Sequence, residues 1–219
     1  MTLEHDAVRE TLIEATLALM DQGGLEAVKA RPLAQAVGVS VGTIYNLFGS
    51  VDGLVMAANM RVYADLGAMV RDRIAMRAQE GTGHIAKHTS VSSAPDRVRE
   101  RLLELAGLYI DFVAANSRRW AAVIAFDRQG SSTATPEGYE TQLEALIGLV
   151  AAVLGDLPTC HDTERAQTLA RALWSSVYGI VSIAFFSGEH ATARQRTWDQ
   201  IVMLVTAVVA GLAASALPS

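Results

Sequence analysis

Residues 29–48, KARPLAQAVGVSVGTIYNLF, hold the side chains best suited to binding a nucleic acid. Hydroxyl, amide and cationic groups recur there at short spacing, and such groups bind phosphate oxygens and the edges of bases. Small side chains between them allow a backbone to come close to a ligand. The candidate residues are Lys29, Arg31, Ser40, Val41, Gly42, Thr43, Tyr45 and Asn46.

Two short helices must position these groups. Pro32 suits the first turn of a helix over residues 30–37, and Ser40 suits the cap of a second helix over residues 41–48. Ala34 lets the helices cross closely, while Gly38 can take the positive φ of a sharp turn. This spacing predicts a helix-turn-helix, whose second helix fits a major groove about 12 Å wide.

Other reactive residues form weaker arrangements. His84 and His88 have the spacing of two metal ligands on one helix face, but they lie in a Ser/Gly-rich stretch, where we expect a loop and no metal site. Cys160 and His161 are adjacent, a geometry that rarely lets a thiol and an imidazole act together. We expect no enzyme activity, no cofactor and no metal; an enzyme that uses Cys160 or a histidine is one alternative.

The elements around these residues are all helical in the sequence pattern. Apolar residues recur at helical spacing throughout the 219 residues, and no segment alternates as a strand does. The pattern predicts an all-α fold of about nine helices. We expect a helix-turn-helix domain over residues 1–54 and a larger helical domain over residues 55–219, with a polar loop over residues 79–95.

Composition fits a protein of the cytoplasm. Hydrophobic residues make up 51% of the chain, the net charge is −5, and the single cysteine excludes an internal disulfide. We find no secretory signal at the amino terminus. The uncharged run over residues 201–217 reaches the lower edge of the roughly 17–25 residues that a membrane span needs. We favour a buried helix there, with a membrane-associated helical protein as a further alternative.

The segment GVSVGTIYNLFGSVDGL and its surroundings over residues 8–58 resemble the DNA-binding signature of TetR-family transcriptional regulators. The resemblance implies a homodimer that binds palindromic double-stranded operator DNA, and a small-molecule effector that releases the DNA. It implies that Lys29 and Arg31 lie near the DNA backbone and that Tyr45 contacts phosphate. It places Val41, Gly42, Thr43 and Asn46 at bases or flanking phosphates. The resulting function is a ligand-responsive regulator, with repression as the simplest mode.

The chain departs from this family in its basic residues. Lys29 stands where the family usually has a capping Thr, Leu47 where it commonly has His, and Val51 where it commonly has a phosphate-contacting Lys. Residues 1–54 contain three basic and seven acidic residues. We therefore expect weak non-specific DNA binding and a shallow dependence of operator binding on salt.

Large side chains in the second domain are candidates for an effector pocket. The stretch LWSSVYG is similar to a Trp-x-x-x-His-Gly pattern of one TetR subset, with Tyr in place of His. Arg118 and Arg119 leave an acidic or acyl ligand open, although solvated charges at a helix end are the favoured explanation. We expect a small apolar or amphipathic effector. The candidate pocket residues are Tyr109, Phe112, Trp120, Ile124, Tyr139, Trp174 and Tyr178.

The last two predicted helices, one beginning at Asp162 and one running from about Ala193 to Leu217, are too apolar for the surface of a monomer. Ala207, Gly211 and Ser215, at spacing four, allow another helix to approach closely. We expect these two helices to form the dimer interface as a four-helix bundle. The candidate interface residues are Ile180, Ile183, Trp198, Ile201, Val205, Val208 and Leu212.

Overall fold

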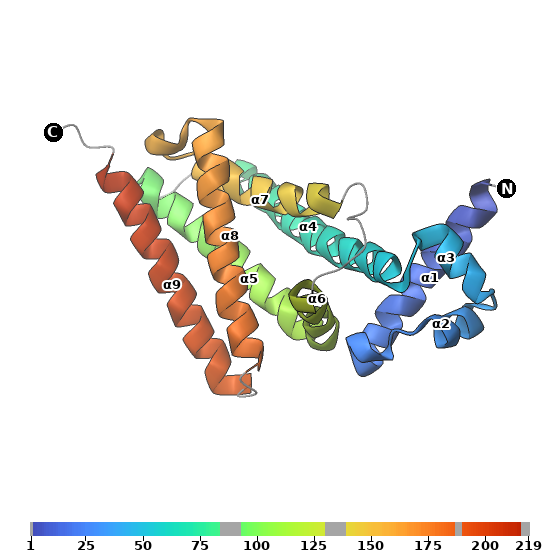
Figure 1. Ribbon diagram of the computed structural model, residues 1–219. Coiled ribbons are helices and arrows are strands. Elements are labelled where there is room, and N and C mark those ends of the chain that lie inside the picture. The colour runs from blue at the N-terminus through green and yellow to red at the C-terminus, as the bar shows by residue number, and fades with distance from the viewer. Residues whose placement is uncertain (1, 84–92, 130–138, 187–189, 216–219) are drawn as a thin grey trace. The chain divides into compact units, whose positions relative to one another are not determined.

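The computed structural model describes residues 2–83, 93–129, 139–186 and 190–215. In these ranges every regular element is helical, which confirms the predicted all-α fold class (Figure 1). The described α-helices are α1 (Thr2–Gly23), α2 (Ala30–Val37), α3 (Val41–Phe48), α4 (Val51–Gly83), α5 (Ala94–Ala115), α6 (Ser117–Gln129), α7 (Tyr139–Leu154), α8 (Thr163–Phe186) and α9 (His190–Ala214). Short 3-10 turns follow α1 and α7, at Leu25–Ala27 and Pro158–Cys160.

Short polar side chains fix where several helices begin. At the start of α4, the Ser50 hydroxyl accepts a hydrogen bond from the Gly53 N–H at 2.9 Å. At the start of α8, Asp162 Oδ1 accepts from the Glu164 N–H at 3.1 Å. Each bond satisfies an N–H group that the first turn of a helix leaves without a partner inside the helix.

The long helix α4 extends further than the sequence predicted. It ends at Gly83, so residues 79–83, which were expected in a loop, are helical. A glycine in a helix interior costs only about 1 kcal/mol relative to alanine, and the preceding turns already propagate the helix. The rest of the expected loop falls mainly on residues 84–92, outside the described part of the chain, and α5 begins at Ala94.

The helices group into two compact units. Unit 1 contains residues 1–65 and 112–142, and unit 2 contains residues 66–111 and 143–219. The helix α4 therefore supplies residues to both units, and α6 belongs to unit 1. These units are defined by packing, whereas the predicted boundary at residue 54 separates two functions and stays a prediction.

Unit 1 is tied together by contacts between α1, α4 and α6. Trp120 of α6 is fully buried and packs edge-on against Tyr63 of α4, with ring centroids 6.0 Å apart. Arg119 pairs with Asp21 at the end of α1, with its Nε 3.0 Å from the carboxylate. Arg118 donates to the Gln22 carbonyl at 3.0 Å. These contacts hold α6 against α1, and α2 packs against α1 as well.

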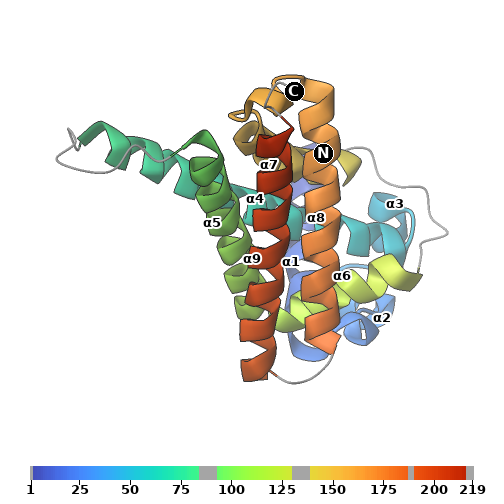
Figure 2. The same ribbon diagram turned by 90° about the vertical axis from the view of Figure 1, so that its left-hand side faces the viewer.

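In unit 2, α8 and α9 lie side by side (Figures 1 and 2). Val181 of α8 and Ile201, Val205 and Val209 of α9 are buried. Their spacing along α9, four residues apart, places them on one face of the helix. That face forms part of the core of the unit.

Candidate nucleic-acid interface and ligand pocket

The turn between α2 and α3 has the geometry that a helix-turn-helix requires. Gly38 has φ 76° and ψ 30°, in the left-handed region. The Val39 N–H bonds back to the Ala34 carbonyl at 2.9 Å, and the Gly38 N–H bonds to the Gln35 carbonyl at 3.3 Å. A Cβ added at Gly38 would meet nothing within 4 Å, so the positive φ rather than crowding favours glycine here.

The start of α3 uses two of the predicted DNA-binding residues for its own structure. The Ser40 hydroxyl accepts a hydrogen bond from the Thr43 N–H at 3.1 Å, and the two hydroxyl oxygens are 2.9 Å apart. Val41 and Thr43 are half-buried. Ser40 therefore acts first as the cap of α3, and this cap fixes the helix end that would meet DNA.

The outward face of α3 carries the exposed members of the predicted set. Ile44 is fully buried and fixes the helix to unit 1. Gly42 and Asn46 are exposed, and Tyr45 keeps 49% of its surface exposed although it is aromatic. The phenol of Tyr45 and the amide of Asn46 can reach phosphates and base edges, and Gly42 has no side chain to keep the backbone of α3 away from them.

The basic residues around α3 have different roles. Lys29 is the N-cap residue of α2 without a side-chain capping bond, and Lys29 and Arg31 are both exposed. Arg9 instead donates to the Leu47 carbonyl at 2.9 Å and lies 4.4 Å from the centre of the Phe48 ring. Sequence reasoning missed this anchor of α3, because the contact joins residues 38 positions apart.

Acidic residues of α1 are partly engaged inside unit 1. Arg61 of α4 pairs with Glu10, and its Nη1 donates to Glu14 at 2.9 Å. The hydrogen bond to Glu10 raises the pKa of Arg61 against the opposing effect of burial. Two negative charges of the predicted head are thus held by a residue that lies outside residues 1–54.

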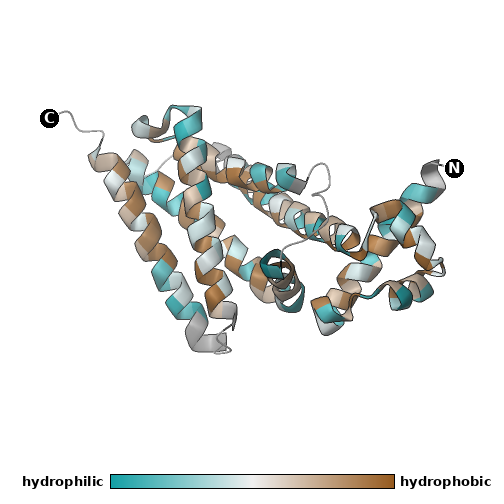
Figure 3. Cartoon of the chain, viewed as in Figure 1, coloured by the Kyte–Doolittle hydropathy of each residue, from teal (hydrophilic) through white to brown (hydrophobic). Residues whose placement is uncertain are grey.

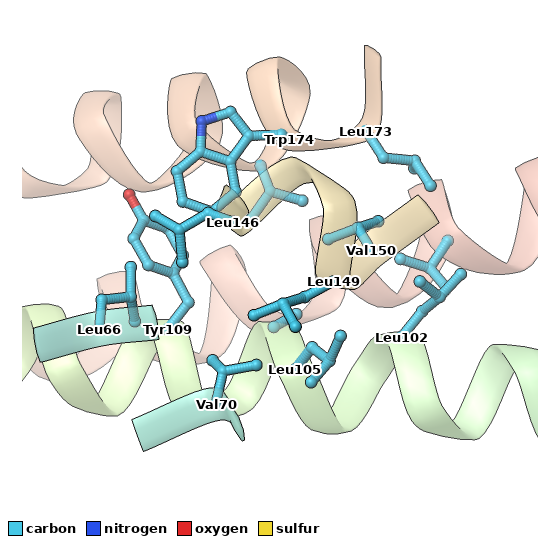
Figure 4. Close-up of a pocket in the computed structure, with 13 residues that line it drawn as sticks. Leu66, Val70, Leu102, Leu105, Tyr109, Leu146, Leu149, Val150, Leu173 and Trp174 are labelled. Atoms are coloured by element: carbon cyan, nitrogen blue, oxygen red, sulfur yellow. The ribbon is translucent and has the colours of Figure 1, made fainter. Parts of the chain in front are cut away.

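Unit 2 contains an apolar cavity of about 70 Å³ (Figure 4). Its walls are mainly aliphatic side chains from α4, α5, α7, α8 and α9. Tyr109 of α5 and Trp174 of α8 are its aromatic members, with ring centroids 5.6 Å apart and planes at 43°. A cavity with such walls suits an apolar ligand, which must widen it on entry.

Tyr109 and Trp174 are the two predicted pocket residues that line this cavity. Phe112, Trp120 and Ile124 lie in unit 1, where Phe112 packs edge-on against the buried Trp120 with centroids 6.1 Å apart. The structure therefore does not gather the seven residues into one site. The side chain of Tyr139 is outside the described residues, and Tyr178 does not line the cavity.

The sequence carried no signal for the aliphatic walls of the cavity. Leu66 and Val70 of α4 and Val205 of α9 line it, although none of them bears a distinctive chemical group. Arg118 and Arg119, which left an acidic ligand open, instead bond to α1 within unit 1. Their role in the described structure is to join two helices.

Several predicted interface residues of α9 lie inside the chain. Ile201, Val205 and Leu212 are buried, with at most 8% of their surface exposed, so placing them at a dimer interface was wrong. Val208, Trp198 and Ile180 are each half-buried. Because α9 is apolar on more than one face, its sequence could not show which face meets the core.

A second face of α8 and α9 is exposed and apolar. Ile183 of α8 and Met203 of α9 each keep 74% of their surface exposed. Ala207, Gly211 and Ser215 are exposed as well. Their role in close approach of another helix stays a prediction. Figure 3 shows the apolar colouring along the carboxyl-terminal half of α9. Contiguous apolar surface of this kind is typical of interaction sites.

The remaining reactive residues form no shared site in the described structure. Cys160 is buried and His161 is exposed, so the thiol and the imidazole lie in different surroundings. The described ranges contain no group of three His, Cys, Asp or Glu residues that could hold a metal ion. His84 and His88 lie outside them.

One described helix, taken alone, is long and apolar enough to cross a membrane, over residues 194–214. Only 28% of its most apolar window is buried within the chain. The exposed apolar face of α9 accounts for this low burial, and a partner helix would cover it as well as lipid would.

Models of one protein family match two parts of the chain. The model described as bacterial regulatory proteins of the tetR family matches residues 12–58, which include the whole helix-turn-helix. The model described as a tetracycline-repressor-like C-terminal domain matches residues 102–205, which include most of the cavity walls.

Individual relatives agree with these matches. The HTH-type transcriptional regulator BetI of Yersinia pestis is 27% identical over 182 residues, covering 83% of both chains. BetI of Paraburkholderia phymatum is 40% identical over 72 residues, 32% of this chain and 37% of its own. A tetR-family regulator from Streptomyces coelicolor has the same fold, with a TM-score of 0.62 at 20% identity over 96% of this chain and 83% of its own.

The fold, the exposed helix behind a glycine turn and these matches define a helix-turn-helix transcriptional regulator. The chain belongs to the TetR family. Regulators of this family are ligand-responsive repressors that bind operator DNA.

Proposed function

We propose that this regulator binds a palindromic operator as a homodimer and is released from it by a small molecule bound in the cavity of unit 2. The exposed face of α3, held by the Gly38 turn and the Ser40 cap, carries the proposal. The regulator acts in the cytoplasm and needs no reaction of its own.

DNA contacts divide between the two short helices. Lys29 and Arg31 bind phosphates beside the start of α2, where both side chains are exposed. Tyr45 donates its hydroxyl to a phosphate, and Asn46 reads a base edge in the major groove. Gly42 lets the backbone of α3 come close to the DNA.

The dimer forms through the exposed faces of α8 and α9. Ile183 and Met203 supply large apolar contacts, while Ala207 and Gly211 let two helices approach closely. An interface of this kind is isologous, so the two heads meet symmetric half-sites about 34–36 Å apart.

The effector acts through α4. Leu66 and Val70 of this helix line the cavity, and residues earlier in the same helix, such as Leu54, are buried in unit 1. A ligand that widens the cavity favours a different placement of α4 and so lowers the population of the DNA-binding state. A shift of this kind needs a few kcal/mol of differential binding.

Selection of bound duplexes from a random pool tests the proposal. We expect a palindromic consensus for the purified protein. The N46A variant should lose preference at one position of each half-site, by about 1–3 kcal/mol. The Q35A variant alters an exposed residue of α2 and should keep the consensus. Recovery of no preferred duplex, or an unchanged consensus with N46A, would contradict the proposed reading of DNA by α3.

A further inference from the structure

A charged hollow adjoins the apolar cavity of unit 2. It has a volume of about 270 Å³ and is lined by residues of α4, α5 and α7. Leu105 of α5 lines both the hollow and the cavity. The two spaces are therefore neighbours that share this leucine side chain.

The polar side chains of this hollow carry more positive than negative charge. Arg73 Nε donates to Glu104 at 2.6 Å, and Arg77 pairs with the same carboxylate through Nη1. Arg101 pairs with Asp156, also through Nη1. Three guanidinium groups and one carboxylate, that of Glu104, therefore line the hollow, so its lining carries a net positive charge.

The pairs of Arg77 and Arg101 each use a single guanidinium nitrogen. A guanidinium group carries five N–H donors in a planar fork, and the fork matches the two oxygens of a carboxylate. The side chains of Arg77 and Arg101 keep 44% and 33% of their surface exposed, so an incoming anion can reach them.

The same face of α4 changes from apolar to cationic between the two spaces. Leu66 and Val70 line the cavity, and Arg73 and Arg77 line the hollow. These residues follow at intervals of four, three and four, which is the spacing of one helix face. A molecule lying along this face would meet aliphatic walls first and guanidinium groups next.

From these observations we infer that the effector is an amphipathic monoanion, with an apolar body in the cavity and a carboxylate head between Arg77 and Arg101. This inference rests on the proposed function, since it takes the cavity of unit 2 to be the effector site. The aliphatic walls exclude a polar body, and the excess of guanidinium groups disfavours a cationic head.

A pair of ligands that differ only in the head group tests this inference. Decanoate and decan-1-ol are titrated into the full-length protein at pH 7.5, where the acid is ionised, and binding is followed by calorimetry. We expect decanoate to bind at least about tenfold more tightly, a difference of about 1.4 kcal/mol. Decanoate should also release a selected operator duplex at lower concentration than decan-1-ol.

Arginine variants locate the head group. R77M and R101M keep an apolar stem, and each should bring the affinity ratio of the two ligands close to one while leaving decan-1-ol binding unchanged. R99M is the matched control, because Arg99 lies on the same helix as Arg101 and pairs with Asp96 outside the hollow. Thermal melts check that all three variants fold.

The possible failures are distinguishable. Equal affinities for the two ligands in the unaltered protein, or an equal loss in R99M, would overturn the anionic head and leave the cavity as effector site. Binding of neither ligand would overturn the alkyl-carboxylate class and leave the effector site of the proposed function standing. Failure to select a duplex at all would contradict the proposed regulator, independently of both ligands.

Discussion

In unit 1 the largest side chain, Trp120, is fully buried between aromatic neighbours, whereas in unit 2 Trp174 stands beside a cavity. The units also differ at their surfaces, since Ile183 and Met203 of unit 2 are mostly exposed. Apart from the exposed Tyr45 of α3, the large apolar side chains described in unit 1 serve its own packing. Unit 2 leaves part of its large apolar side chains uncovered, which is where a ligand or a second chain can bind.

The largest expected effect comes from comparing substitutions on two faces of α9, one buried and one exposed. V205E buries a carboxylate in the core of unit 2, which costs several kcal/mol, so we expect little folded protein by circular dichroism. M203E changes an exposed residue and should fold but elute as a monomer from a sizing column. A dimeric M203E variant would show that the exposed face of α9 is not the interface.

Truncating the two tryptophans tests the difference between a packed core and a cavity wall. W120A should lower the free energy of unfolding by about 3–5 kcal/mol, as for other fully buried aromatic residues. W174A removes a half-buried ring and should cost about 1–2 kcal/mol while changing ligand binding. Urea titrations measure the loss of unfolding free energy in each variant. Equal losses would contradict the difference between a packed core and a cavity wall.

Asn59 is a polar residue in the apolar interior of unit 1. It is fully buried, and neither of its side-chain amide atoms has a hydrogen-bond partner among the described residues. N59L keeps a similar volume and should raise the free energy of unfolding by about 1–2 kcal/mol. T16V is the control, since it removes a buried hydroxyl that does bond, to the Leu12 carbonyl at 2.8 Å, and should destabilise. Stabilisation by T16V, or a loss with N59L, would contradict this assignment.

Salt dependence measures how few cations unit 1 offers to DNA. If Lys29 and Arg31 are the phosphate contacts of each head, a dimer neutralises four phosphates, and the slope of log affinity against log salt is roughly −4. K29A should reduce the slope by roughly 2 per dimer. R99M should leave it unchanged. A slope near −9 in the unaltered protein would reveal phosphate contacts beyond these two residues.

The smallest expected effect is the pH dependence of the cluster around Glu104. Burial would raise the pKa of Glu104, but hydrogen bonds from Arg73 and Arg77 outweigh it and lower the pKa below 4.5. The pair therefore stabilises the fold above pH 4.5, and this contribution is lost as the pH falls through the lowered pKa. E104Q should cost about 1 kcal/mol at pH 7 and nothing in acid. The side chain of Glu144 is 45% exposed, so E144Q should change the free energy of unfolding less.

Much of the fold followed from the sequence because its signals are local. The bounds of α2 and α3 came from Pro32, Gly38 and Ser40, whose effects act within a turn or two. The prediction of about nine helices came from apolar spacing in the same way, and the described ranges contain nine. The interface prediction did not hold for Val205, which is buried in the chain. Periodicity identifies an apolar face of a helix but not the surface that this face meets.

The candidate sites were predictable only in part. The residues of the head lie within 20 positions of one another, so their spacing alone brought them together. The cavity collects aliphatic residues from helices far apart in the chain, and such side chains look like any core residue. The anchor from Arg9 to Leu47 has the same cause, since nothing near Arg9 in the sequence marks its distant acceptor.

The engagement of Arg9 with the end of α3 bears on how the regulator searches a genome. A guanidinium held against a carbonyl and an aromatic ring keeps its charge but extends less readily to a phosphate, which limits its part in the non-specific contacts that let proteins slide along DNA. We expect this molecule to dwell mostly in free solution and to find its target by repeated three-dimensional encounters. Few copies would then be sequestered on bulk DNA, and a small cellular pool would suffice to fill one target.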